Sequence, residues 1–398
     1  MDFKLSEEQG QLRDTLLRFM QKQYGFEKRR EIIHSAKGYS EEVWKNFAEM
    51  GLLAMSLPEE HGGLGGNAVD TLVVMEAFGR GMVVEPYLSS VVMGAGLIAR
   101  AGNEKQKADM LPAIAEGRIL LALAHYETGA RYELNNVATR AQKDAGGWRL
   151  SGAKTAVLHG GGADKLIISA RSSGGTRDDA GISLFLVDAK SAGVSLRSYP
   201  AHDGHRMAEL TLKDVQVGAD ALLGGEGRGL ALVEHSIDAA IAALCAEAVG
   251  NMAALIEATL AYLKTRKQFG VPIGTFQVLQ HRMADMVMHA EQARSMAYLA
   301  AAKIDASDAH ERRRAVAAAK ALVGQAARYV GQQAVQLHGG IGVTDELAVG
   351  HYFKRLTLIN ASFGDADHHL ARFSDLILEE SGTSSSAQPK LVKSRKAG

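Results

Sequence analysis

Five residues in the C-terminal half have types suited to binding a phosphorylated ligand. Arg266 follows a long apolar stretch, and a guanidinium at a helix end can neutralise a pyrophosphate and bind paired phosphate oxygens. Gly339 and Gly340 allow the backbone to approach a ligand without interference from a Cβ atom. Gln277 and Gln336 carry neutral amides that can hydrogen-bond a dinucleotide. Together these residues predict a dinucleotide site built on helices.

Composition and charge exclude several other classes of ligand. The chain has 398 residues, is 46% hydrophobic and 23% charged, and so is typical of a globular protein of two or three domains. Its 45 Lys and Arg balance 45 Asp and Glu, which disfavours a nucleic-acid partner. The single cysteine, Cys245, excludes an intramolecular disulfide and a multi-cysteine metal site. No metal is expected at His368 and His369, because adjacent helical residues point about 100° apart.

The apolar segments predict neither export nor a membrane span. The first eight residues include three acidic ones and lack the apolar stretch of a signal peptide, which favours a cytoplasmic location. The longest alanine-rich stretch, residues 237–263, contains four charged or amide side chains whose transfer into lipid would be costly. We therefore expect this stretch to be a buried helix of a bundle.

The elements that must position these residues fall into three regions. Residues 1–118 have apolar residues at helical spacing and begin with Ser6 and Gln9 in a capping-box pattern, so we predict a helical N-terminal domain. Residues 119–224 form a predicted β-domain with a hairpin turn at residues 144–147. Its strand-like runs are 120–124, 148–151, 165–170, 181–187, 194–198 and 210–217.

Long amphipathic stretches return in residues 225–380 and predict a C-terminal four-helix domain. The four stretches are 230–267, 275–303, 309–337 and 346–379. Residues 381–398 carry four basic residues, no acidic residue and little to bury, which predicts a disordered tail.

Several sequence runs, in this order, resemble those of the acyl-CoA dehydrogenase family of flavoproteins, and the resemblance covers about residues 1–380. The N-terminal run is WKNFAEMGL at residues 44–52 followed by LPEEHGG at 57–63. The β-domain has GAK at residues 152–154 with Ala163-Asp164. The C-terminal region has RKQFGVPIGTFQ at residues 266–277 and QLHGGIG at 336–342.

This resemblance implies a fold, a cofactor and an assembly. The fold is an α+β multidomain architecture with a helical N-terminal domain, a central β-barrel or sandwich domain and a C-terminal four-helix bundle. The cofactor is FAD, and the assembly is a tetramer, either homomeric or with a related subunit. Tyr126 and Leu158 take positions next to the isoalloxazine ring. The residues expected to bind the FAD of a neighbouring subunit are Arg266, Gln268, Phe269, Gln277, Gln336, Gly339 and Gly340.

The implied reaction converts an acyl-CoA thioester to a trans-2-enoyl-CoA. A carboxylate base removes the α-proton while the β-hydride passes to the flavin, and an electron-transfer flavoprotein is the implied acceptor. This chain departs from the family pattern at the two positions where the catalytic base is usually found. Phe363 stands where the commonest catalytic Glu is found, and Ala240 and Ile241 stand at the alternative position. None of these side chains can move a proton.

Two other carboxylates are candidates for the base. Glu247 lies two helical turns beyond Ala240, on nearly the same helix face, and is the first candidate. Asp365 lies two residues after Phe363 in the same predicted loop and is the alternative. Without a functional role, Glu247 would be a buried, hydrogen-bonded residue and Asp365 a helix cap. The third possibility is that this chain contains no base.

The function therefore has alternatives at this point. The chain is either an active FAD-dependent acyl-CoA dehydrogenase or a catalytically silent subunit that completes the FAD site of a heteromeric one. The segment of residues 363–370, FGDADHHL, is similar to the small-subunit type of pimeloyl-CoA dehydrogenase and to paired-subunit acyl-CoA dehydrogenases. A nitroalkane oxidase of the same fold, with Asp365 as its base, is a third alternative.

Overall fold

The computed structural model describes residues 4–380, in which three regions follow one another along the chain. The predicted tail, residues 381–398, lies outside the described residues. The N-terminal region is helical and begins with the expected capping box, in which the Gln9 backbone N–H donates to Ser6 Oγ at 3.1 Å. Its helices are α1 (Glu7–Gln23), α2 (Phe26–His34), α3 (Glu41–Glu49), α4 (Ala68–Gly81), a π-helical segment (Tyr87–Ala95), α5 (Gly96–Ala101) and α6 (Glu104–Ala115).

The central region is one eight-stranded sheet with strand order β6-β7-β3-β2-β4-β5-β8, and β1 pairs in parallel with β4. Its strands are β1 (Leu121–Ala124), β2 (Arg140–Asp144), β3 (Gly147–Leu158), β4 (Lys165–Arg171), β5 (Ile182–Asp188), β6 (Val194–Pro200), β7 (Arg206–Gly218) and β8 (Leu222–Leu223). The predicted turn at residues 144–147 joins β2 to β3. Strand β2 was not predicted, because Ala141 is its single inward-facing residue.

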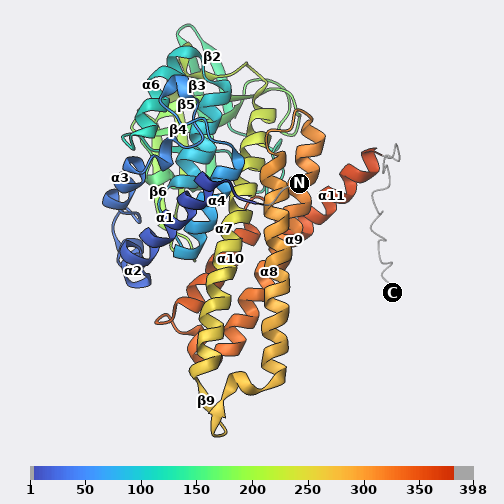
Figure 1. The fold of residues 1–398 in the computed structure, drawn as a ribbon. Helices are drawn as coiled ribbons and strands as arrows, with labels where there is room; N and C mark the ends of the chain where they lie inside the picture. The colour runs from blue at the N-terminus through green and yellow to red at the C-terminus, as the bar shows by residue number, and fades with distance from the viewer. Residues whose placement is uncertain (1–3, 381–398) are drawn as a thin grey trace, which may run out of the picture.

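The C-terminal region is a helical bundle with a small hairpin at one end (Figure 1). Its elements are α7 (Gly229–Thr265), β9 (Lys267–Gln268), β10 (Val271–Pro272), α8 (Gln277–Lys303), α9 (Ala309–His338), α10 (Ala348–Ala361) and α11 (Ala366–Glu380). The fourth predicted helix is wrong as a single element, because the chain breaks between α10 and α11. Phe363 and Gly364 have φ angles of 57° and 108° there, which a continuous helix excludes.

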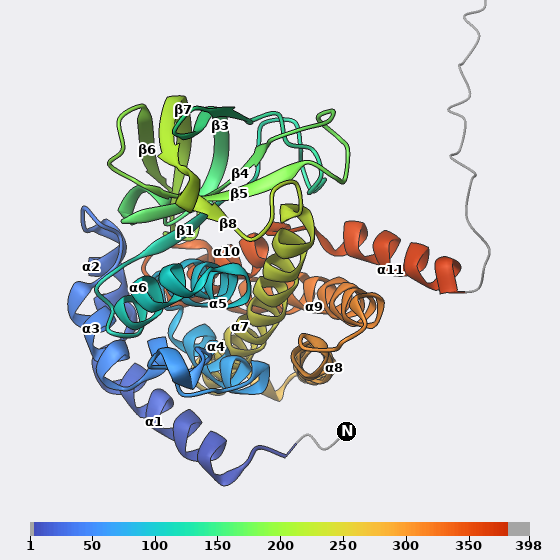
Figure 2. The same ribbon diagram turned by 90° about the horizontal axis from the view of Figure 1, so that it is seen from above.

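Helix α7 is the central element that joins the regions. The helix is long and apolar enough to cross a membrane. However, 78% of its most apolar 18-residue segment is buried inside the protein, as in the core helix of a bundle. Helix α4 crosses it so closely that a Cβ atom on Gly79 would lie 2.0 Å from the Glu247 carbonyl oxygen. Viewed from above, the sheet covers one side of the helical body and α11 projects away from it (Figure 2).

Candidate active site

A cavity of about 510 Å³ lies where the sheet, the π-helical segment, α7 and the break between α10 and α11 meet. Its wall is mostly apolar, and the predicted Tyr126 and Leu158 both line it. Other lining residues include Leu88, Met93, Thr128, Gly129, Ala156, Met207, Ile237, Leu244, Leu358 and Phe363. A concave, largely apolar site with few polar groups is typical of small-molecule and cofactor binding.

The wall presents flat surfaces where β1 and β3 end. Tyr126 follows β1, and its ring centroid lies 6.1 Å from that of Phe363. Leu158 ends β3, and Ala156 in the same strand has a φ of 52°. Such a backbone conformation is costly for a residue with a Cβ atom and is found where the surrounding structure enforces it. These surfaces suit a planar aromatic ring.

Glu127 is the one carboxylate among the described residues that line this cavity, and its oxygen atoms are already engaged. Its Oε1 accepts hydrogen bonds from Lys154 Nζ at 2.7 Å and from the Thr139 backbone N–H at 3.0 Å, and its Oε2 accepts one from the Ala138 backbone N–H at 2.8 Å. Burial alone would raise the pKa of Glu127, but Lys154 and these hydrogen bonds lower it. The carboxylate is therefore held charged and oriented rather than free to take a proton.

His125 is buried beside this pair and makes the stability of the fold depend on pH. Burial, followed by the charge of Lys154, lowers the pKa of His125 to about 3, whereas an unfolded histidine titrates near about 6.5. Protonation therefore favours unfolding, so stability is complete above pH 6.5 and falls as the pH drops toward 3. We expect His125 alone to cost about 2 kcal/mol between pH 7 and pH 5.

The measurement is urea denaturation of wild type and His125→Gln at both pH values. The variant should lose about 2 kcal/mol less than wild type on acidification. The matched control is His202→Gln, since His202 is exposed, and it should follow the wild-type dependence. Equal slopes for His125→Gln and wild type would contradict the assignment.

Glu247 does not line the large cavity but lies one layer behind it. Its Oε1 and Oε2 accept hydrogen bonds from Arg355 Nε at 2.5 Å and Nη2 at 2.6 Å, and the Glu247 side chain is 4% exposed. Arg355 also donates through Nη1 to Asp203 Oδ2 at 2.8 Å, and Asp203 in turn lies 3.1 Å from His205 Nδ1. Burial would lower the pKa of Arg355, but Glu247 and Asp203 raise it instead. In this arrangement Glu247 fixes Arg355, which lines the cavity.

Asp365, the alternative base, lies at the start of α11 and outside the cavity wall. Its Oδ1 accepts a hydrogen bond from the His368 backbone N–H at 2.9 Å, which is the capping geometry of a helix N-terminus. Its Oδ2 lies 4.0 Å from Arg131 Nη2. Phe363 occupies the wall at the position where the family base is expected.

The residues predicted to bind the dinucleotide gather at the other end of α7. The ring of His338, the last residue of α9, stacks on that of Tyr262 with centroids 4.5 Å apart, and this brings the end of α9 beside the end of α7. A Cβ atom at Gly339 or Gly340 would meet nothing within 4 Å, so the backbone there is open to a ligand. Phe269 is 91% exposed. The side chains of Arg266, Gln268, Gln277 and Gln336 are also in exposed residues.

The two groups of predicted residues lie far apart along α7. Leu244 lines the cavity, and Arg266 follows the end of the same helix. At 1.5 Å per residue their separation along α7 is about 33 Å. The sheet domain and the β9 hairpin stand at opposite ends of the molecule (Figure 1). The cavity and the exposed residues around Arg266 are therefore two separate sites within this chain.

Sequence reasoning missed Arg355 and His125, which both line the cavity. Arg355 follows Lys354 on an amphipathic helix. A positively charged residue on such a helix normally lies on the face exposed to solvent. The exposed fraction of Arg355 is only 6%. Its burial could have been anticipated only by pairing it with Glu247, which is distant in the sequence.

Comparison with known proteins identifies the same three regions. The sequence matches the models of the acyl-CoA dehydrogenase N-terminal domain over residues 6–118, the middle domain over 122–215 and the C-terminal domain over 227–375. A probable acyl-CoA dehydrogenase of Bacillus subtilis, YngJ, is 30% identical over 377 residues, which cover 92% of this chain and 97% of YngJ.

Two solved structures have the same fold along nearly their whole length. A chain of a variant of the Tcur3481-Tcur3483 steroid ACAD aligns with a TM-score of 0.85 and 31% identity, covering 94% of this chain and 99% of its own. A chain of the ChsE4-ChsE5 complex from Mycobacterium tuberculosis aligns with a TM-score of 0.86 and 26% identity, covering 95% and 99%. Together with the three matched domains, these similarities show that the chain belongs to the acyl-CoA dehydrogenase family of FAD-dependent oxidoreductases.

Proposed function

We propose that this chain takes part in the FAD-dependent α,β-dehydrogenation of an acyl-CoA thioester as one half of a heteromeric enzyme, whose second chain supplies the catalytic carboxylate. The observation that carries the proposal is the wall of the 510 Å³ cavity. Phe363 stands at the expected base position, and the single carboxylate on the wall among the described residues, Glu127, is tied to Lys154. A catalytic carboxylate must reach the substrate, and among the described residues no free carboxylate faces this cavity.

FAD, when bound, supplies the hydride acceptor of the reaction. Tyr126 and Leu158 would pack against its ring system, and the residues around Arg266 and Gly339 would hold the dinucleotide of a neighbouring subunit. Glu127 and Lys154 would keep the polar edge of the cavity rigid, because both are buried and paired with each other. The division of the predicted FAD contacts between the two ends of the chain supports an oligomer in which related chains share each cofactor.

The cavity favours a bulky or extended apolar acyl group. Aliphatic side chains of the π-helical segment and α7 line its wall, and the aromatic side chains there are those of Tyr126, Tyr132 and Phe363. A neighbouring groove of about 310 Å³ shares Tyr126, Tyr132 and Phe363 with it and adds Arg372 and Glu234. This mixed polar groove suits the neutral, hydrogen-bonding pantetheine arm of CoA. Two similar solved proteins carry paired-chain names, which agrees with a two-chain enzyme.

The test compares the chain expressed alone with the chain co-expressed with a related subunit. We expect the lone chain not to bleach when acyl-CoAs are added under anaerobic conditions. The pair should be yellow and should bleach, and an electron-transfer flavoprotein should then reoxidise it. If the lone chain is yellow and bleaches, the chain is a self-sufficient dehydrogenase with its own base, Glu247 or Asp365, and the proposal is wrong.

Arg266 provides a separate prediction about cofactor binding. Its side chain is exposed and has no ion-pair partner within the described part of the chain, so it is available to a pyrophosphate. We expect Arg266→Gln to weaken FAD binding about tenfold or more, because a charge-assisted contact to a phosphate is lost. The ratio of flavin to protein after gel filtration of the assembled enzyme measures this.

Lys264→Gln is the matched control, since it removes an exposed positive charge two residues earlier. It should leave the flavin content unchanged. An equal loss of flavin in both variants would show that general charge, rather than a specific phosphate contact, is responsible.

A further inference from the structure

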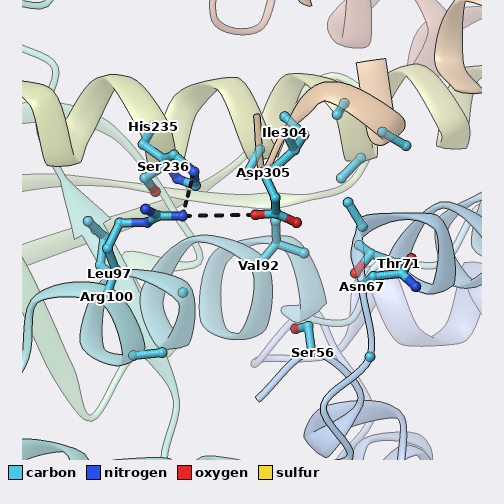
Figure 3. Close-up of a pocket in the computed structure, with 18 of the residues that line it drawn as sticks. Ser56, Asn67, Thr71, Val92, Leu97, Arg100, His235, Ser236, Ile304 and Asp305 are labelled. Atoms are coloured by element: carbon cyan, nitrogen blue, oxygen red, sulfur yellow. Dashed lines mark hydrogen bonds and ion pairs between the residues drawn. The ribbon is translucent and has the colours of Figure 1, made fainter. Parts of the chain in front are cut away.

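A second cavity, of about 380 Å³, lies on the other side of the layer formed by the π-helical segment and α7. It shares no lining residue with the 510 Å³ cavity. Its wall combines the loop before α4, residues 92–100, the first half of α7 and the connection after α8 (Figure 3). The volume falls within the range of roughly 300–1,000 Å³ that small-molecule sites occupy.

Small residues on α7 create this space. Ala239, Ala242 and Ala243 form one side, and Gly96 and Ala301 lie on the wall around them. Larger apolar side chains complete the lining, namely Val92, Leu97, Leu232 and Ile304. A body of methylene groups would therefore bury its surface here, which is the main favourable term for an apolar ligand.

One buried polar group on the wall lacks a partner. Ser236 is 5% exposed, lines the cavity and has an Oγ atom without a hydrogen-bond partner among the described residues. Buried polar groups in native structures are nearly always hydrogen-bonded, and an unpaired one indicates a missing ligand or water. Ser236 therefore marks a polar contact that a bound molecule would complete.

The mouth of the cavity carries an incompletely neutralised cation, Arg100. Its Nη2 lies 2.7 Å from His235 Nε2 and 3.9 Å from Asp305 Oδ1, and Figure 3 shows all three side chains converging. Burial, followed by the charges of Arg100 and Arg312, lowers the pKa of His235 to about 4, so this histidine is neutral at pH 7 and accepts the hydrogen bond. Asp305 has a side chain that is 67% exposed and is the single carboxylate lining the cavity among the described residues, so its loose contact can be exchanged for a ligand.

We propose that this cavity binds a single-chain amphiphile with a carboxylate head, such as a medium-chain fatty acid, separately from the site where the acyl-CoA reacts. The carboxylate pairs with Arg100 at the mouth, and the alkyl chain lies along Val92 and Leu232 against the small residues of α7. A guanidinium binds a planar carboxylate through two parallel hydrogen bonds. A singly charged head also meets less repulsion from Asp305 than a phosphate would.

Isothermal titration calorimetry with dodecanoate and with the neutral dodecanol tests this on the intact chain. Wild type should bind dodecanoate at least about tenfold more tightly than dodecanol. Arg100→Gln should remove that preference. Ala239→Leu should abolish the binding of both, because the added methyl groups fill the cavity.

Two control variants separate this site from other sources of binding. Arg18→Gln removes an exposed charge on α1 and should leave dodecanoate affinity unchanged. Ala361→Phe narrows the 510 Å³ cavity and should also leave it unchanged. The proposal is overturned if wild type does not prefer dodecanoate over dodecanol, or if Ala361→Phe rather than Ala239→Leu abolishes binding. The comparison of the two ligands on wild type stands even if a variant does not fold.

Discussion

The substitution Glu247→Gln is expected to lower the free energy of unfolding by about 3–5 kcal/mol, because it breaks a buried ion pair from one side only. Arg355 is 6% exposed and would keep its charge with Asp203 as its remaining carboxylate partner. In Gln an NH2 group replaces one carboxylate oxygen, so one of the two guanidinium N–H groups would face a donor instead of an acceptor. Thermal and urea denaturation, followed by circular dichroism, measure the effect.

An exposed ion pair provides the control for this prediction. Glu257 pairs with Arg80 at 2.9 Å but is 65% exposed, so Glu257→Gln should cost less than about 1 kcal/mol. Replacing the whole buried cluster, as in Glu247→Leu with Arg355→Met and Asp203→Asn, should recover part of the loss, because no unpaired buried charge remains in it. The result that contradicts a structural role is a Glu247→Gln protein that denatures like wild type yet no longer bleaches with any acyl-CoA.

Much of the fold could be predicted because its signals are local. The capping box at Ser6 and Gln9 and the turn at residues 144–147 depend on a few adjacent residues, and both are present. Strand β2 was missed because an exposed strand with polar residues has little alternation to detect. The amphipathic stretch 346–379 was described as one element because helical spacing continues on both sides of the loop at Phe363 and Asp365, although that loop itself was predicted.

The candidate site was harder to predict, because its arrangement depends on contacts between distant residues. The partner of Glu247 is Arg355 on another helix, and sequence spacing along α7 gives no information about it. The positions of Tyr126 and Leu158 on the cavity wall were predictable, since both lie at strand ends in the family pattern. The separation of about 33 Å between Leu244 on the cavity wall and Arg266 follows from the length of α7, which the apolar stretch had already indicated.

Phe363→Glu is expected to create a general base in the 510 Å³ cavity. Phe363 lies on the cavity wall, its backbone carbonyl is fixed by His369 Nε2 at 2.9 Å, and its loop is held by Lys320 Nζ, which donates to the Gly364 carbonyl at 2.6 Å. A carboxylate in this apolar wall would be partly desolvated, which raises its pKa toward the range useful for proton transfer. A positioned base typically contributes about 10²–10⁴-fold to such a step.

The activity of this introduced base can be measured as exchange of the α-protons of a saturated acyl-CoA in D₂O, followed by NMR. This measurement does not require turnover of the flavin. Phe363→Glu should accelerate the exchange about 10²–10⁴-fold over wild type, whereas Phe363→Gln, with the same shape and no basic group, should not. Because every other lining residue of the cavity is unchanged in both variants, all three proteins should bind the acyl-CoA. If all three bind it and exchange its protons equally slowly, the α-carbon of the substrate does not lie beside residue 363. The catalytic base would then have to lie beside a different wall of the cavity. A carboxylate from the second chain would not be needed next to residue 363.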